Sequence, residues 1–101
     1  MSTDIQHYTV ILRGGDFSPS NQQWRDVFTR VDLFAPNSVE AVEEAGEVAF
    51  DWEVAPNYWF STPEDASQEK NTLEEQGDKL TSLRRLEAHE VYPSRSPEQL
   101  H

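Results

Sequence analysis

The sequence predicts an α+β fold, a small antiparallel three-stranded sheet with two helices on one face, in the order β-β-α-α-β. Three observations carry this prediction. Two early segments alternate apolar and polar residues, two middle segments combine helix-capping residues with helical spacing of apolar residues, and a late segment alternates again. With 101 residues, the chain has room for one domain, so these elements must share one small core.

The first strand is expected at residues 7–13, and a glycine pair follows it. Gly14 and Gly15 are predicted to end the strand, because glycine weakens strand interiors and favours turns. Residues 14–23 are polar and turn-forming, so we predict a loop there. The strand should bury at least one face, since apolar Tyr8, Val10 and Leu12 alternate with Thr9, Ile11 and Arg13.

The second strand is expected at residues 24–35, where Val27, Thr29, Val31 and Leu33 share one face, and Pro36 ends it. A helix should follow, with Asn37 or Ser38 as its N-cap, and end near Trp52. At about 100° per residue, one arc of this helix is apolar and the opposite arc is acidic. Because Gly46 lies in the apolar arc, we expect a strand backbone to approach it closely. That arc holds Val39, Val42, Ala45, Gly46, Ala49 and Phe50.

A second helix is predicted to begin at Pro63, with Thr62 as N-cap and acidic residues in its first turn. Its buried stripe should be narrow, formed by Ala66, Leu73 and Leu80. Residues 82–92 fit either a helix or a strand, and we predict a strand. Residues 93–101 hold two prolines and no apolar pattern. They predict a disordered tail, which leaves 5–92 as a single acidic domain.

The net charge of −11 belongs to the middle of the chain. Residues 40–78 hold twelve acidic residues and one basic residue, Lys70, while the two flanking segments nearly balance. Direct binding to nucleic acid or anionic lipid is disfavoured, because each phosphate contact would meet repulsion. The expected partner is a basic protein surface, such as that of a nucleic-acid-binding protein.

The acidic arc of the first helix matches the charge spacing of a polynucleotide. Its four glutamates fall within about 10 Å along the axis at about 1.5 Å rise per residue. Duplex DNA carries one charge per about 3.4 Å of each strand. A basic groove that normally holds phosphates would fit such a face, with aromatic residues as anchors. The acidic residues of the second helix, between Glu64 and Asp78, are expected to extend the same track. The predicted partner-binding residues are Glu40, Glu43, Glu44, Glu47, Asp51, Tyr58, Trp59, Phe60, Glu64, Asp65, Glu69, Glu74 and Glu75.

Two simpler interpretations stand beside this hypothesis. An acidic helix face is usually only solvated, and Trp59 and Phe60 are more often core than interface in a small domain. The concentration of acid in one segment favours binding, because charge that serves solubility alone should spread over the whole chain.

No catalytic or cofactor motif is found, so we expect no enzyme, no cofactor and no metal site. Glu87 and His89 would share a strand face, but nothing near them indicates a pocket that would tune a general base. The three histidines lack metal-ligand spacing. Without cysteine, a secretory signal or a run of 18 apolar residues, the chain is expected in the cytoplasm.

In size, acidity and aromatic content the chain resembles small phage-encoded inhibitors of host defence nucleases, such as anti-CRISPR, anti-restriction and DNA-mimic proteins. The resemblance covers composition and no motif. It implies an inhibitor or adaptor that blocks a basic groove in the host cytoplasm. The alternative is a non-catalytic structural or assembly subunit of a virion or multi-protein complex, which would bind through aromatic residues and a sheet edge.

Overall fold

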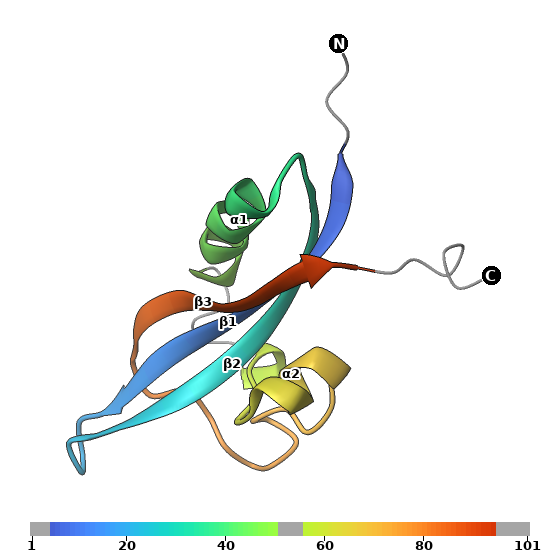
Figure 1. Cartoon of the computed structure of the whole chain (residues 1–101). Helices are drawn as coiled ribbons and strands as arrows, with labels where there is room; N and C mark the ends of the chain where they lie inside the picture. The colour runs from blue at the N-terminus through green and yellow to red at the C-terminus, as the bar shows by residue number, and fades with distance from the viewer. Residues whose placement is uncertain (1–4, 51–55, 95–101) are drawn as a thin grey trace.

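The chain forms a three-stranded antiparallel sheet and two helices, and the computed structural model describes residues 5–50 and 56–94 (Figure 1). The elements in chain order are β1 (Gln6–Ser18), β2 (Gln23–Ala35), α1 (Ser38–Phe50), the 3-10 turn η1 (Pro56–Tyr58), α2 (Pro63–Gln68) and β3 (Leu83–Pro93). The strand order in the sheet is β2-β1-β3. The predicted α+β class, the three-stranded antiparallel sheet and the order β-β-α-α-β are confirmed.

β1 and β2 form one long hairpin that pairs continuously from Gln6 opposite Ala35 to Ser18 opposite Gln23. The prediction that Gly14 and Gly15 end the first strand is therefore wrong, and the loop expected at 14–23 shrinks to residues 19–22. The turn is closed by Gln22, which adopts a left-handed backbone with φ of 55°. Both glycines remain within the β1–β2 ladder.

Gly14 is a glycine because there is no room for a side chain. A Cβ at this position would lie 2.6 Å from Leu83 Cδ1 and 3.2 Å from both the Trp59 ring and the Arg85 carbonyl oxygen. The absence of a side chain lets Trp59 pack directly on the strand. The sequence signal was real, but it marked a close approach instead of a strand end.

β1 is buried on both faces, which decides where the helices go. Tyr8, Val10 and Leu12 pack with α1. Ile11 packs on the other face with Ala66 of α2, and with Phe28 and Phe60. Successive strand residues point to opposite faces, so α1 and α2 cover opposite sides of the sheet (Figure 1). The prediction that both helices lie on one face is corrected by this packing.

α1 meets the sheet through small side chains. Ala41, Ala45 and Ala49 are fully buried and repeat every four residues along the helix. Asn37, one of the two residues predicted for this position, is its N-cap, since its Oδ1 accepts a 3.0 Å hydrogen bond from the Glu40 amide. The expected close approach at Gly46 is wrong, because nothing lies within 4 Å of where its Cβ would be. The predicted end near Trp52 lies outside the described residues.

α2 begins as predicted and ends much earlier. The Thr62 hydroxyl accepts from the Asp65 amide at 3.1 Å, and Pro63 opens the helix. The helix stops at Gln68 because Glu69 takes a left-handed conformation, with φ of 53°. Of the predicted stripe, Ala66 packs under the helix, whereas Leu73 and Leu80 pack with Trp59 from the following loop.

The segment around Trp59 and Phe60 covers the outer edge of β2. Phe28 and Phe60 exchange two backbone hydrogen bonds, and the Leu73 amide bonds to the Trp59 carbonyl. Trp59 is fully buried against Val27 and Leu73, and Phe60 is buried against Phe28. Both rings therefore belong to the core.

β3 confirms the strand predicted at 82–92. It pairs antiparallel with β1, with two register shifts, opposite Ile11/Leu12 and Gly15/Asp16. Pro93 is the last residue of the strand, and the Ser94 amide donates to the His7 carbonyl. The remainder of the predicted tail, residues 95–101, lies outside the described residues.

A buried carboxylate fixes the start of β3. Asp16 on β1 is 2% exposed and accepts hydrogen bonds from the Thr81 amide at 2.9 Å and the Ser82 amide at 2.7 Å. Arg25 of β2 donates to the same carboxylate at 3.1 Å. These three contacts, here called the Asp16 network, join the hairpin to the loop before β3.

The two glycines give a matched test of packing. Gly46→Ala is expected to stabilise the protein by about 0.5–1 kcal/mol, because alanine favours the helix and its Cβ meets open space. Gly14→Ala is expected to destabilise it by about 1–3 kcal/mol through overpacking against Trp59 and Leu83. Urea unfolding of both variants measures the difference. Equal effects of the same sign would contradict this account of Gly14.

Removal of the buried carboxylate should loosen the β3 junction. Asp16→Ala is expected to lower the free energy of unfolding by about 3 kcal/mol or more, because two backbone amides and Arg25 lose their acceptor. Asp16→Asn keeps one acceptor oxygen at the same size and should lose roughly half as much. Denaturant unfolding checks both values. The network would not be structural if alanine were no worse than asparagine.

Candidate functional site

The acidic arc predicted for the first helix lies at the surface of α1. Glu40, Glu43, Glu44 and Glu47 are all exposed, and at about 100° per residue they cover an arc of about 100°. Within the described residues, none of the four takes part in an ion pair. Their charges therefore face solvent without a counter-ion from the described residues.

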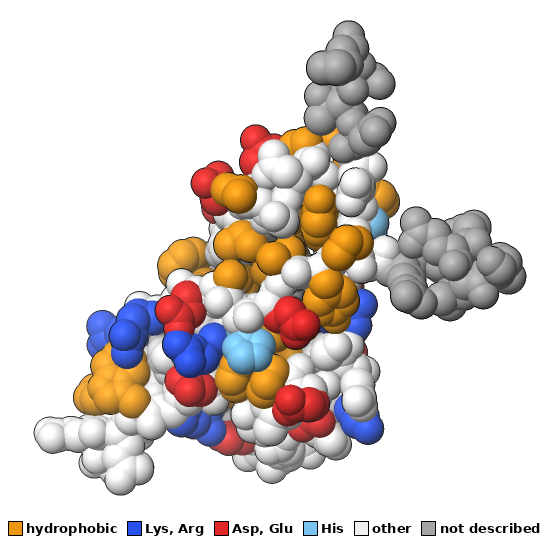
Figure 2. Space-filling view, in the orientation of Figure 1, with side chains coloured by type: hydrophobic (Ala, Val, Ile, Leu, Met, Phe, Trp, Pro, Cys, Tyr) orange, Lys and Arg blue, Asp and Glu red, His pale blue; other side chains and the backbone are white. Residues whose placement is uncertain are grey.

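An apolar stripe runs beside these carboxylates. Val39 is 66% exposed and Phe50 is 58% exposed, although both were predicted to be buried. The three buried alanines form the side of the helix that faces the sheet, so these larger residues face outward. Gly46 lies between them at nearly the same helical angle. We call Glu40, Glu43, Glu44 and Glu47, together with Val39, Gly46 and Phe50, the outer face of α1. In Figure 2, acidic and hydrophobic side chains lie next to each other over this helix.

The aromatic residues predicted to anchor a partner do not join this face. Trp59 is fully buried and Phe60 is 4% exposed, so their rings are not available for binding in this structure. Tyr58 is 44% exposed, and its carbonyl accepts a hydrogen bond from Thr29. Asp51 lies outside the described residues.

The acidic residues of the second segment are dispersed. Glu64 and Asp65 lie in the first turn of α2, on the opposite side of the sheet from α1. Glu69 pairs with Arg30 at 3.4 Å, and Glu75 accepts from the Thr72 amide. Glu74 is exposed in the loop that follows α2. The continuous acidic track over two helices is therefore not formed.

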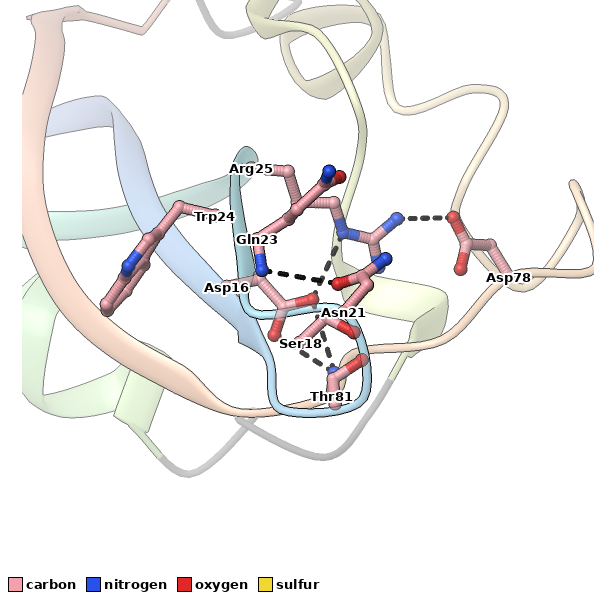
Figure 3. Close-up of a pocket in the computed structure, with 8 residues that line it drawn as sticks. All are labelled: Asp16, Ser18, Asn21, Gln23, Trp24, Arg25, Asp78 and Thr81. Carbon is pink, nitrogen blue, oxygen red and sulfur yellow. Dashed lines mark hydrogen bonds and ion pairs between the residues drawn. The ribbon is translucent and has the colours of Figure 1, made fainter.

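A polar hollow lies near the turn of the hairpin, with a volume of about 250 Å³ (Figure 3). Arg25 crosses it and donates to Asp78 at 2.6 Å as well as to Asp16. The hydrogen bond from Arg25 holds the pKa of Asp78 below its ordinary value, although partial burial opposes the shift. The same bond to Asp78 raises the pKa of Arg25. The charged groups of this hollow therefore hold one another and fix the loop that contains Asp78. The sequence did not reveal them, because residues 14–23 were predicted to be a simple polar loop.

Glu87 and His89 have separate surroundings. Glu87 forms an ion pair with Arg13, while His89 packs edge-on against the Phe28 ring at 5.5 Å. They line two different shallow hollows, Glu87 beside Arg13 and His89 beside Glu64. The shared pocket that a catalytic pair would need is not formed by these two residues.

In the part of the chain that the structure describes, no group of three or more His, Asp or Glu side chains is placed to hold a metal ion. None of its helices is long and apolar enough to span a membrane. Comparison of the chain with protein-family models, curated proteins and solved structures finds no match.

The Arg25–Asp78 pair gives a pH-dependent prediction. Asp78→Asn should lower the free energy of unfolding at neutral pH by at most about 1 kcal/mol, because solvent screens a pair whose partners are 39% and 41% exposed. Since folding lowers the pKa of Asp78, this stabilisation is complete above its ordinary value of 3.8 and is lost as pH falls through the lower folded value.

Urea unfolding of wild type and Asp78→Asn over a pH series measures this contribution. The two proteins should differ by a constant amount near neutrality and converge in acid. A difference that stayed the same at the lowest pH would show that the charge of Asp78 does not contribute.

Proposed function

We propose that the protein is a non-catalytic binding module that docks the outer face of α1 onto a basic surface of another protein. One observation carries this proposal. The chain's own arginines pair with acidic residues elsewhere, at Asp16, Asp32, Glu69, Asp78 and Glu87, and leave the four glutamates of α1 without a counter-ion in the described chain. A partner that supplies lysine or arginine would provide these glutamates with counter-ions.

The apolar stripe supports a protein partner over simple solvation. A solvated face has no need for exposed Val39 and Phe50, whereas protein interfaces combine an apolar centre with a charged rim. The arrangement fits a basic groove with apolar residues along one wall. If that groove normally holds nucleic acid, occupancy by α1 would exclude the polynucleotide, which is the inhibitor or adaptor role expected from composition.

The charge requirement is tested by changing Glu43, Glu44 and Glu47 together to glutamine. Glu40 is kept because an acidic residue in the first turn stabilises the helix. A partner captured from bacterial lysate by the wild type should bind the triple variant about tenfold or more weakly, and high salt should weaken wild-type binding. A matched control, with Asp26→Asn, Glu64→Gln and Glu74→Gln, removes equal charge elsewhere and should bind as wild type.

Two further measurements sharpen the test. Phe50→Ser should weaken capture of the same partner, while Phe34→Ser, which changes a similarly exposed ring on the other face of the sheet, should not. Addition of duplex DNA should release the partner if the basic surface is a nucleic-acid groove. A partner held equally by the wild type and the glutamine triple variant would overturn the proposal.

A further inference from the structure

Among the residues that the structure describes, the outer edge of β3 is open. β3 is at the end of the strand order β2-β1-β3, and within the described ranges its backbone hydrogen bonds go to β1 alone. Seven of its eleven residues are exposed. In Figure 1, β3 crosses in front of β1. An edge of this length offers a row of backbone donors and acceptors to another strand.

The opposite edge of the sheet is protected in a way that β3 is not. The Phe60 backbone bonds to Phe28 of β2, Thr29 donates to the Tyr58 carbonyl, and Arg30 donates to the Ser67 carbonyl. Among the described residues, the chain therefore covers part of one edge with its own segments and places none against the other.

The charge pattern of β3 is complementary to that of a second, antiparallel copy of the same strand. Near its start the strand carries Arg84 and Arg85, and further along it carries Glu87 and Glu90. An antiparallel partner of the same sequence would bring the basic start of each strand beside the acidic part of the other. Arg84 and Glu90 are exposed and form no ion pair in the described chain, so both are available for this pairing.

The regular part of the edge defines where such pairing would be centred. Between the two register shifts, Arg85 to Ala88 pair with Gly15 to Leu12 without interruption. A two-fold axis at Glu87 would place Arg84 of one copy opposite Glu90 of the other, within reach of long side chains. The two Glu87 side chains would then lie opposite each other, each already paired with Arg13 of its own copy.

We propose that two copies of the chain associate through antiparallel pairing of their β3 strands, which would form one six-stranded sheet. The pairing supplies backbone hydrogen bonds at the open edge, and two equivalent Arg84–Glu90 contacts select the second copy as the occupant. The proposal is independent of α1, whose two outer faces would remain free in the dimer. Because each copy carries a net charge of −11, association should strengthen when salt screens the overall repulsion.

Sedimentation of the full chain over a range of protein concentrations, at low and at about 0.15 M ionic strength, measures the dimer. Arg84→Glu and Glu90→Arg, each alone, should weaken dimerisation about tenfold or more by placing like charges together. The double variant restores opposite charges and should dimerise as wild type. Thermal unfolding of each variant controls for folding. A wild type that stays monomeric at all concentrations, or a double variant no better than the singles, would overturn the proposal.

Hydrogen exchange locates the interface independently. Amides of β3 should exchange more slowly at high protein concentration than at low concentration, while those of α1 should not change. A dimer that protects α1 instead of β3 would place the interface elsewhere and refute pairing at this edge.

Discussion

The burial of β1 on both faces is the constraint on which the rest of the structure depends. Four consecutive residues, Thr9 to Leu12, are at most 1% exposed, so this strand must be covered from above and below. The described part of the chain has one α-helix for each side. α1 covers Tyr8, Val10 and Leu12, and α2 with Phe60 covers Ile11. Each of these large apolar side chains contributes about 1.5–3 kcal/mol when it is fully buried.

Local chemistry was readable from the sequence, because it acts over a few residues. The caps at Asn37 and Thr62, the strand that precedes Pro36 and the strand after Ser82 all appear where the sequence predicts them. Gly14 could not be read correctly, because its role depends on Trp59, which is far away in the chain. The length of α2 was overestimated for a similar reason, since Leu73 packs with Trp59 from a loop.

The candidate site likewise combines features that depend on nearby residues, which the sequence predicts, with features that depend on distant contacts, which it does not. The exposed arc of Glu40, Glu43, Glu44 and Glu47 is as predicted, because its shape depends only on helical spacing. Its continuation into residues 64–78 failed, because it required both helices on one side of the sheet. The run Val10-Ile11-Leu12 was evidence against helices on one face alone, since consecutive apolar residues are typical of strands buried on both faces. The Asp16 network left no comparable signal in the sequence.

The seating of α1 on alanine methyl groups has a consequence for how this protein can change over evolutionary time. Ala41, Ala45 and Ala49 hold the helix to the sheet, while its glutamates, Val39 and Phe50 point away from the core. Substitutions on these two sides should have nearly additive effects, because they share few contacts. The outward side can therefore vary in sequence at little cost to stability, while the inward side preserves the fold.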